Sequence, residues 1–463
     1  MKRTLLCVLI VLTLIASLGI YQYSKLNNVS KTDENDVTAS STLAMVLVDG
    51  YGDNATETEI DSFPDPNTHY LDFAKSYCLN GAKIGFDKAN NKVKITSNKA
   101  DSCKLYFRAG TAVNMKADVL AKNTLVTTTP SFSQIATDTN ANIYQAEDDY
   151  GISYYFRGAA TNNYVQFGVW QTDAKYGNYV HCLNVGVAST CGLYFDTLDE
   201  CINYNGQESN CIEADPFVTA GELMYWRIVR INGDGTIRLV YDGTAKGANG
   251  IEQTAVVAQS QYSGEGQEKY VGYTYEENGQ EVDGLLKQAV DNWYQENMIE
   301  VYNKYIADSL FCNDTGLSGT LQGSWDAYNG QYRLETTKMP TLKCADKNDR
   351  YTVNDTVNGN GLLKYPAALL NVDEAAMAGA VSDYPPVNNT NYYLYRGDQY
   401  WTMTPGIKNA SNQFQNYDYS SWLHQAYSTN KSGVRPVINL DADLLFTGNG
   451  TIDSPYVIAG YEQ

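Results

Sequence analysis

Aromatic and polar side chains are concentrated between residues 400 and 427, and this combination suits the binding of a sugar or a peptide. Aromatic rings stack on the apolar faces of such ligands, while amides and carboxylates fix their orientation. A long surface loop whose tryptophans fill the core is the alternative, and it is favoured for Trp401. For Trp422 and His424 the two interpretations are balanced. The predicted ligand-binding residues are Trp401, Asn416, Tyr417, Asp418, Tyr419, Trp422, His424 and Tyr427.

No combination of residues in the sequence predicts a catalytic centre. The chain has 3 histidines, no Gly-x-Ser-x-Gly sequence and no phosphate-binding glycine motif. Asp373 and Glu374 form the clearest pair of acids, but capping and the helix dipole also favour acids at a helix N-terminus. We therefore predict no catalytic residue and no cofactor.

Eight cysteines follow the N-terminal leader, and an even number of cysteines in an exported chain predicts disulfides. Zinc sites usually contain closely spaced Cys-x-x-Cys pairs, which this chain lacks, so we predict no metal site. The eight cysteines fall into neighbouring pairs with hairpin signals between the partners. Proximity predicts the bonds Cys78–Cys103, Cys182–Cys191, Cys201–Cys211 and Cys312–Cys344.

The N-terminal leader predicts export. Lys2 and Arg3 precede an apolar run from Leu5 to Ile20 that is just long enough to cross a bilayer. A secretory signal peptide has the same pattern, so cleavage stays open, with an uncleaved anchor favoured. The positive residues place the N-terminus in the cytoplasm and the rest of the chain outside. We predict a single-pass membrane protein with an extracellular C-terminal part, or a secreted protein if the leader is cleaved.

The net charge of −20 argues against nucleic acid as a partner, because phosphate backbones bind basic surfaces. The chain also contains 38 tyrosines against 12 phenylalanines. Tyrosine is common on recognition surfaces, but it is also favoured in half-exposed strands, and this second explanation covers most of them.

The sequence divides into parts of different composition. The predicted parts are a signal anchor over 1–23, a polar stalk over 24–43, a small disulfide-closed β domain over 44–110, a linker over 111–147, and a larger domain over 148–463 with a cysteine-rich insertion near 182–211.

Local patterns predict three elements inside the larger domain. Asn232-Gly233-Asp234-Gly235 lies between two apolar strands and predicts a tight hairpin, with a calcium loop as the weaker alternative. Apolar residues at helical spacing predict one helix over 284–308 and a shorter one over 373–379, with Asp373 as its cap.

The C-terminal half resembles one family of exported modules. The resemblance rests on the helix near 285–306, on the segment Tyr400–Pro405, on the polar loop that follows, and on Gly433–Val437. The block Tyr225–Tyr241 is also similar. These features resemble C-type-lectin-like modules of the formylglycine-generating/sulfatase-modifying branch, which recur in exported proteins of Gram-positive bacteria. The resemblance covers residues 148–458.

The resemblance implies a mixed core with long ligand-facing loops, and it gives the loop 411–431 the position of a diversified binding surface. The oxidising branch of the family needs cysteines near its C-terminal site, and this chain has none after Cys344. The calcium-binding sequences of sugar-binding lectins are also missing. The expected fold class is α+β, with a small β-rich N-terminal domain followed by a C-type-lectin-like mixed domain with long loops.

These observations predict a membrane-anchored surface protein of the receptor or adhesin type. Its partners would be the membrane, through the N-terminal helix, and a glycan or protein ligand on the outer surface. The alternatives are an extracellular enzyme that acts on glycans and a purely structural surface protein.

Overall fold

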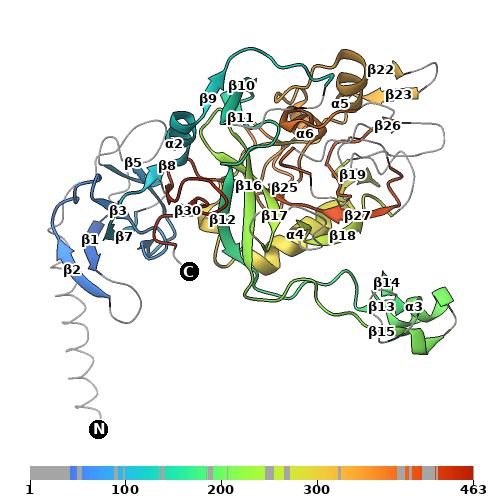
Figure 1. The fold of residues 1–463 in the computed structure, drawn as a ribbon, viewed down its shortest axis with the longest axis horizontal. Helices are drawn as coiled ribbons and strands as arrows, with labels where there is room; N and C mark the ends of the chain where they lie inside the picture. Colours follow the sequence, from blue (N-terminus) through green and yellow to red (C-terminus); the bar gives the residue numbers. More distant parts are fainter. Residues whose placement is uncertain are drawn as a thin grey trace, which may run out of the picture. The chain divides into compact units, whose positions relative to one another are not determined.

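The computed structural model describes most of the chain from Thr42 to Tyr461 (Figure 1). No helix among these residues is long and apolar enough to cross a membrane. The predicted anchor, 1–23, and nearly all of the predicted stalk, 24–43, lie outside the described part and stay predictions. The described residues are 42–49, 55–87, 92–96, 100–134, 136, 141–183, 185, 191–205, 207–245, 255–264, 272–321, 325–382, 392–395, 399–408, 423 and 426–461.

The fold is β-rich, and the predicted α+β class is wrong. Strands account for 38% of the described residues and helices for 16%. The helix predicted over 284–308 is α4 (Leu285–Asn297), which ends before the buried residues Tyr302 and Ile306. Tyr302 and Ile306 flank a short helical turn after α4 and are buried at nearly helical spacing. The apolar periodicity of the sequence therefore predicted a helix that is longer than α4. The other described α-helices are α2 (Met115–Lys122), α3 (Leu198–Asn205), α5 (Asn329–Tyr332) and α6 (Val372–Ala378).

Contacts between residues divide the chain into two compact units, and the first uses both ends of the chain. Of the described residues, it combines those between 42 and 118 with 442–448 and 456–461. The second contains Val119–Asp441 and Asn449–Pro455. C-terminal residues thus belong to the same unit as residues 44–110, over which the sequence predicts a small domain.

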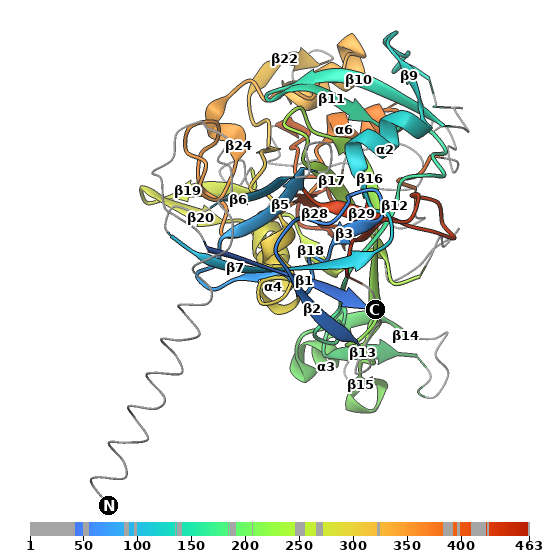
Figure 2. The ribbon, with the colours of Figure 1, turned by 90° about the vertical axis from the view of Figure 1, so that its left-hand side faces the viewer.

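The first unit has a sheet of five strands in which β1 (Thr42–Asp49) and β7 (Ser102–Ala109) are parallel neighbours (Figure 2). Leu43, Leu105 and Phe107 from these two strands are buried. The strands that pair antiparallel with them are β2 (Thr56–Ile60), β3 (His69–Leu71) and β4 (Tyr77–Cys78). Two further strands, β5 (Lys83–Asp87) and β6 (Lys92–Thr96), form a separate hairpin.

A second sheet of this unit joins the two ends of the chain. Its central strand β29 (Leu445–Thr447) pairs with β8 (Val113–Asn114) on one side and with β30 (Val457–Ile458) on the other. Leu445 and Phe446 of β29 are each about 1% exposed. The end of the chain thus supplies core side chains to the N-terminal unit.

The second unit is built on an eight-stranded sheet. Its central hairpin, β16 (Leu223–Ile231) and β17 (Ile237–Gly243), confirms the prediction from Asn232–Gly235. In the turn, the N–H of Gly235 donates to the carbonyl of Asn232 at 2.9 Å, and Gly235 has a φ of +91° that favours glycine. The other strands of the sheet are β9 (Thr124–Val126), β10 (Asn142–Asp148), β11 (Gly151–Tyr155), β12 (Tyr164–Val169), β25 (Ala367–Ala368) and β28 (Val437–Leu440).

Helix α4 packs against this sheet through large aromatic side chains. The rings of Trp293 in α4 and Trp226 in β16 have centroids 6.1 Å apart, and Trp226 also meets Tyr241 of β17 at 5.5 Å. All three side chains are buried. The residues 111–147, expected to form a linker, contain α2, β9 and most of β10.

Short strand pairs surround the large sheet. They are β18 (Ala258–Gln261) with β27 (Lys431–Val434), β19 (Thr274–Glu277) with β20 (Gln280–Asp283), β21 (Phe311–Cys312) with β24 (Arg350–Tyr351), and β22 (Leu317–Leu321) with β23 (Trp325–Tyr328) and β26 (Ile407–Lys408).

The structure contains the four disulfides that proximity predicted. They are Cys78–Cys103, Cys182–Cys191, Cys201–Cys211 and Cys312–Cys344. Disulfides of this number fit an extracellular location.

Candidate functional site

The aromatic residues predicted to bind a ligand differ in burial where the structure describes them. Trp401 is fully buried, its Nε1 donates to the carbonyl of Ser260 at 2.7 Å, and its ring lies edge-on to Tyr262. Trp401 is therefore a core residue, which is the alternative favoured for it from sequence. Tyr427 is 51% exposed. The remaining predicted residues, Asn416, Tyr417, Asp418, Tyr419, Trp422 and His424, lie outside the described residues.

Glu374, one half of the acidic pair, is part of a buried network that joins helix α6 to the central hairpin. Its carboxylate accepts from Arg230 Nε at 3.0 Å and from Arg238 at 2.5 Å. Burial would raise the pKa of Glu374, but the charges of Arg238 and Arg230 outweigh it and hold that pKa below its usual value. The N-cap of α6 is Asn371 rather than Asp373, and it forms a capping box with Glu374.

Asp373, the other half of the pair, points to a different arginine. Its carboxylate accepts from Arg333 Nε at 2.9 Å and from the N–H of Thr341 at 3.0 Å, and Arg333 also contacts Asp314. Both acids thus have structural partners. Within the described residues, no group of three His, Cys, Asp or Glu side chains could hold a metal ion.

A different candidate lies between β12 and β16, where the chain leaves the large sheet and returns to it. We call residues 172–221 the excursion. Its neck is held by backbone hydrogen bonds, from Gly221 N–H to the carbonyl of Trp170 at 2.8 Å and from Ala174 N–H to Val218 at 2.9 Å. Figure 1 shows β13, β14, β15 and α3 at the end of two adjoining extended segments. The strands are β13 (Tyr179–Cys182), β14 (Cys191–Phe195) and β15 (Cys211–Glu213), in the order β14-β13-β15.

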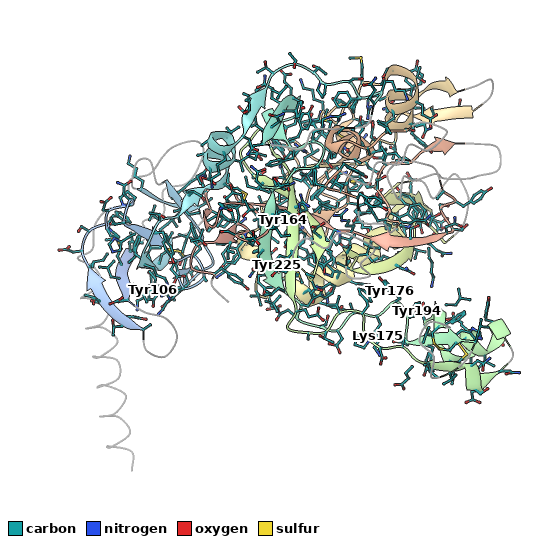
Figure 3. The ribbon with its side chains drawn as sticks, in the orientation of Figure 1. Tyr106, Tyr164, Lys175, Tyr176, Tyr194 and Tyr225 are labelled. Carbon is teal, nitrogen blue, oxygen red and sulfur yellow. A yellow bond between two sulfur atoms is a disulfide. The ribbon has the colours of Figure 1, made fainter. Side chains whose placement is uncertain are left out.

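Covalent and aromatic contacts hold the excursion in shape. Cys182–Cys191 joins β13 to β14, and Cys201–Cys211 joins α3 to β15. In the neck, the ring of Tyr176 stacks on Phe217 with centroids 4.1 Å apart. It also meets the ring of Tyr194 edge-on at 5.4 Å; Tyr176 and Tyr194 are labelled in Figure 3. A sheet of three short strands is stable only with such support.

Large apolar side chains are exposed on this small, cross-linked sheet. Leu193 of β14 is 46% exposed and Tyr204 of α3 is 59% exposed. Leu193 is the register partner of His181, and the ring of Tyr204 packs on His181 and Phe195, so these four side chains share one face. Leu183 and Val185, in the connection after β13, are also exposed. Exposed apolar side chains gathered on one element are typical of interaction sites.

The excursion is also strongly acidic. Residues 172–221 contain seven carboxylates, while Lys175 is their only Lys or Arg, which leaves a net charge of −6. The carboxylates belong to Asp173, Asp196, Asp199, Glu200, Glu208, Glu213 and Asp215. Lys175 cannot neutralise this charge, so the excursion carries a negative field next to its apolar surface.

The cysteines of the sequence predicted the insertion near 182–211, but no residue of the insertion was predicted to bind a ligand. The available signal was the coincidence of two short cysteine pairs, large apolar residues and one-sided charge within one segment. The segment buries some of its apolar residues in a small cluster of Val180, Cys182 and Ala214, but it leaves Leu193 and Tyr204 exposed.

Comparisons with protein-family models, with curated proteins and with solved structures found no match to this chain.

Proposed function

We propose that this chain is an exported binding protein that contacts a protein partner through the excursion, residues 172–221. The observation that carries the proposal is the exposed apolar surface of Leu193 and Tyr204 on a sheet closed by two disulfides. A rigid scaffold lowers the entropy lost on binding, and aromatic residues commonly anchor protein interfaces. The acidic charge adds long-range attraction for a basic partner.

The N-terminal leader supports a location at the cell surface, with the anchor over residues 1–23 and the excursion outside the membrane. In this arrangement the disulfides form in an oxidising compartment. The aromatic loop near 400–427 stays a predicted second binding surface, with Tyr427 as its described exposed member. The lectin-like resemblance also stays a prediction.

A deletion tests the proposal directly. In the variant, Ala174 is joined to Val218 by an Asn-Gly turn, because these two residues are already bridge partners. The detergent-purified full chain and the variant are compared on a panel of immobilised extracellular proteins and glycans. We expect the native chain to bind a protein on the panel and the deletion variant to lose that binding while keeping its melting temperature.

The same panel distinguishes the two surfaces. A Tyr419→Ala/Trp422→Ala variant reports on the predicted loop and should bind the protein partner of the excursion as the native chain does. Binding that survives the deletion but is lost in the loop variant would transfer the function to the loop and contradict the proposal. A native chain that binds nothing on the panel would favour a structural role.

A further inference from the structure

Strand β14 lies at one edge of the three-stranded sheet in the excursion. The sheet order β14-β13-β15 leaves β14 with β13 as its only partner among the described strands. Proteins usually protect such edges with lysine, proline or a covering element, because the outward N–H and C=O groups can pair with another chain. The sequence of β14, Cys-Gly-Leu-Tyr-Phe, contains no charge and no proline. The other edge, β15, carries Glu213.

Exposed apolar side chains lie on one face of the sheet near β14, and acidic side chains follow the end of this strand. Helix α3 lies over the sheet through the Cys201–Cys211 bond and the packing of Tyr204 on His181 and Phe195. Leu193 and Tyr204 stay exposed beside the edge. Asp196 directly follows β14, and Asp199 and Glu200 are in the first turn of α3.

We propose that β14 accepts an extended, cationic segment of a partner protein as a fourth strand; this inference rests on the proposed function of the excursion. The backbone of the added strand pairs with the outer edge of β14. Alternate side chains then meet Leu193 and Tyr204, while lysine or arginine reaches Asp196 and Asp199. A second copy of β14 is a poorer occupant, because it would bring one net charge of −6 against another.

Synthetic peptides test this inference on the full chain. The probe is a fluorescent decapeptide of alternating lysine and valine, with two matched peptides as controls. One control has glutamate in place of lysine, and the other has alternate backbone nitrogens methylated. By fluorescence anisotropy we expect the lysine peptide to bind, the glutamate peptide not to bind, and methylation to weaken binding at least tenfold, because the methyl groups remove N–H donors.

Variants of the full chain locate the binding. We expect Asp199→Asn to weaken the lysine peptide about two- to fivefold, as for one exposed ion pair. Asp215→Asn, which makes the same charge change beyond β15, is the matched control and should leave binding within about twofold. Tyr204→Ala should weaken binding further, because it removes the apolar contact.

Two results would overturn the inference. Equal binding of the methylated peptide would show that no strand is added. Equal binding to the deletion variant, in which Ala174 is joined to Val218, would show that the lysine peptide binds the acidic chain elsewhere. If the excursion is nevertheless required on the panel of proteins, the proposed function stands and only the cationic strand is wrong.

Discussion

Glu374 pairs with two buried arginines of the second unit, of which Arg230 also pairs with Asp148. Arg230 and Arg238 are at most 5% exposed, and both pair with the carboxylate of Glu374. Glu374→Ala leaves them without that charge, so we expect the free energy of unfolding to fall by about 3–5 kcal/mol. Guanidinium unfolding of both proteins measures the change.

The exposed pair Lys343–Glu147 provides the control for this prediction. It has a similar distance, 2.6 Å, but both side chains are more than half exposed. Solvent screens such pairs, so Glu147→Ala should leave the unfolding midpoint unchanged. Equal effects of the two substitutions would mean that the buried network does not support the fold.

The lowered pKa of Glu374 predicts a pH dependence with a definite sign. A carboxylate whose pKa is depressed in the folded state stabilises the fold above its unfolded pKa, which is about 4.3, and this stabilisation is lost as the pH falls through the folded value. The difference in unfolding free energy between the native chain and Glu374→Gln should be constant above about pH 5 and should narrow at lower pH. Unfolding curves between pH 7 and pH 2 measure it, and a difference that widens on acidification would contradict the assignment.

The chemistry of single residues was predictable only where the cause was local. A helix N-terminus near Asp373 and Glu374 follows from the acids themselves. The burial of Arg238 does not, because the partner that makes burial tolerable is 136 positions away in the sequence. Trp401 differs, because its burial was favoured from sequence, but its hydrogen-bond partner Ser260 was not predictable. A charged residue in a predicted strand is expected to be exposed, and only knowledge of its ion-pair partner would predict its burial.

At the scale of elements, the neck of the excursion depends on the absence of a side chain at Gly177. A Cβ there would lie 2.8 Å from the carbonyl oxygen of Phe195, which is backbone and cannot move aside. We expect Gly177→Ala to destabilise the excursion by about 1–3 kcal/mol. Faster hydrogen exchange across 172–221, with unchanged protection in β16 and β17, would show it.

Gly264 supplies the matched control for this substitution. A Cβ at Gly264 would meet Leu285 Cδ1 at 3.5 Å, an ordinary contact. Gly264→Ala should therefore leave exchange unchanged in both regions. Faster exchange in β16 and β17 as well as in the excursion of Gly177→Ala would contradict the prediction, because it would mean that the two unfold together.

Elements with a local signal were predictable, and elements defined by distant pairing were not. The hairpin β16–β17 follows from the turn Asn232–Gly235, and the disulfides follow from proximity. The fold class failed because many strands are only two to five residues long and pair with strands far away in the sequence. The strand β25, for example, has two residues and pairs with β28. Two residues are too few to show the alternation of apolar and polar side chains that predicts a strand.

At the scale of the whole molecule, the first unit depends on the last residues of the chain. Phe446 is 1% exposed, pairs in register with Val113 and Ile458, and meets the ring of Tyr456. Phe446→Ala should destabilise the first unit by about 3–5 kcal/mol, because it leaves a cavity in the core. Hydrogen exchange in β7 measures the effect on a strand that is far from Phe446 in the sequence.

Val357 offers the control for this prediction, because its side chain is 81% exposed. Val357→Ala removes apolar atoms without creating a cavity and should not change exchange in β7. If β7 also keeps its protection in Phe446→Ala, the C-terminal strands contribute nothing to the stability of the first unit.

The pairing of β8 with β29 determines when the first unit can finish folding during synthesis. Asn114 donates a hydrogen bond to the carbonyl of Ala442, a residue 328 positions later. Chains emerge N-terminus first, and domains usually fold in that order. Here β8 emerges long before β29, so the first unit cannot be completed until β29 has also been synthesised. A chain cut short by premature termination or proteolysis would leave that unit unfinished, which gives quality-control proteases a direct mark of an incomplete molecule.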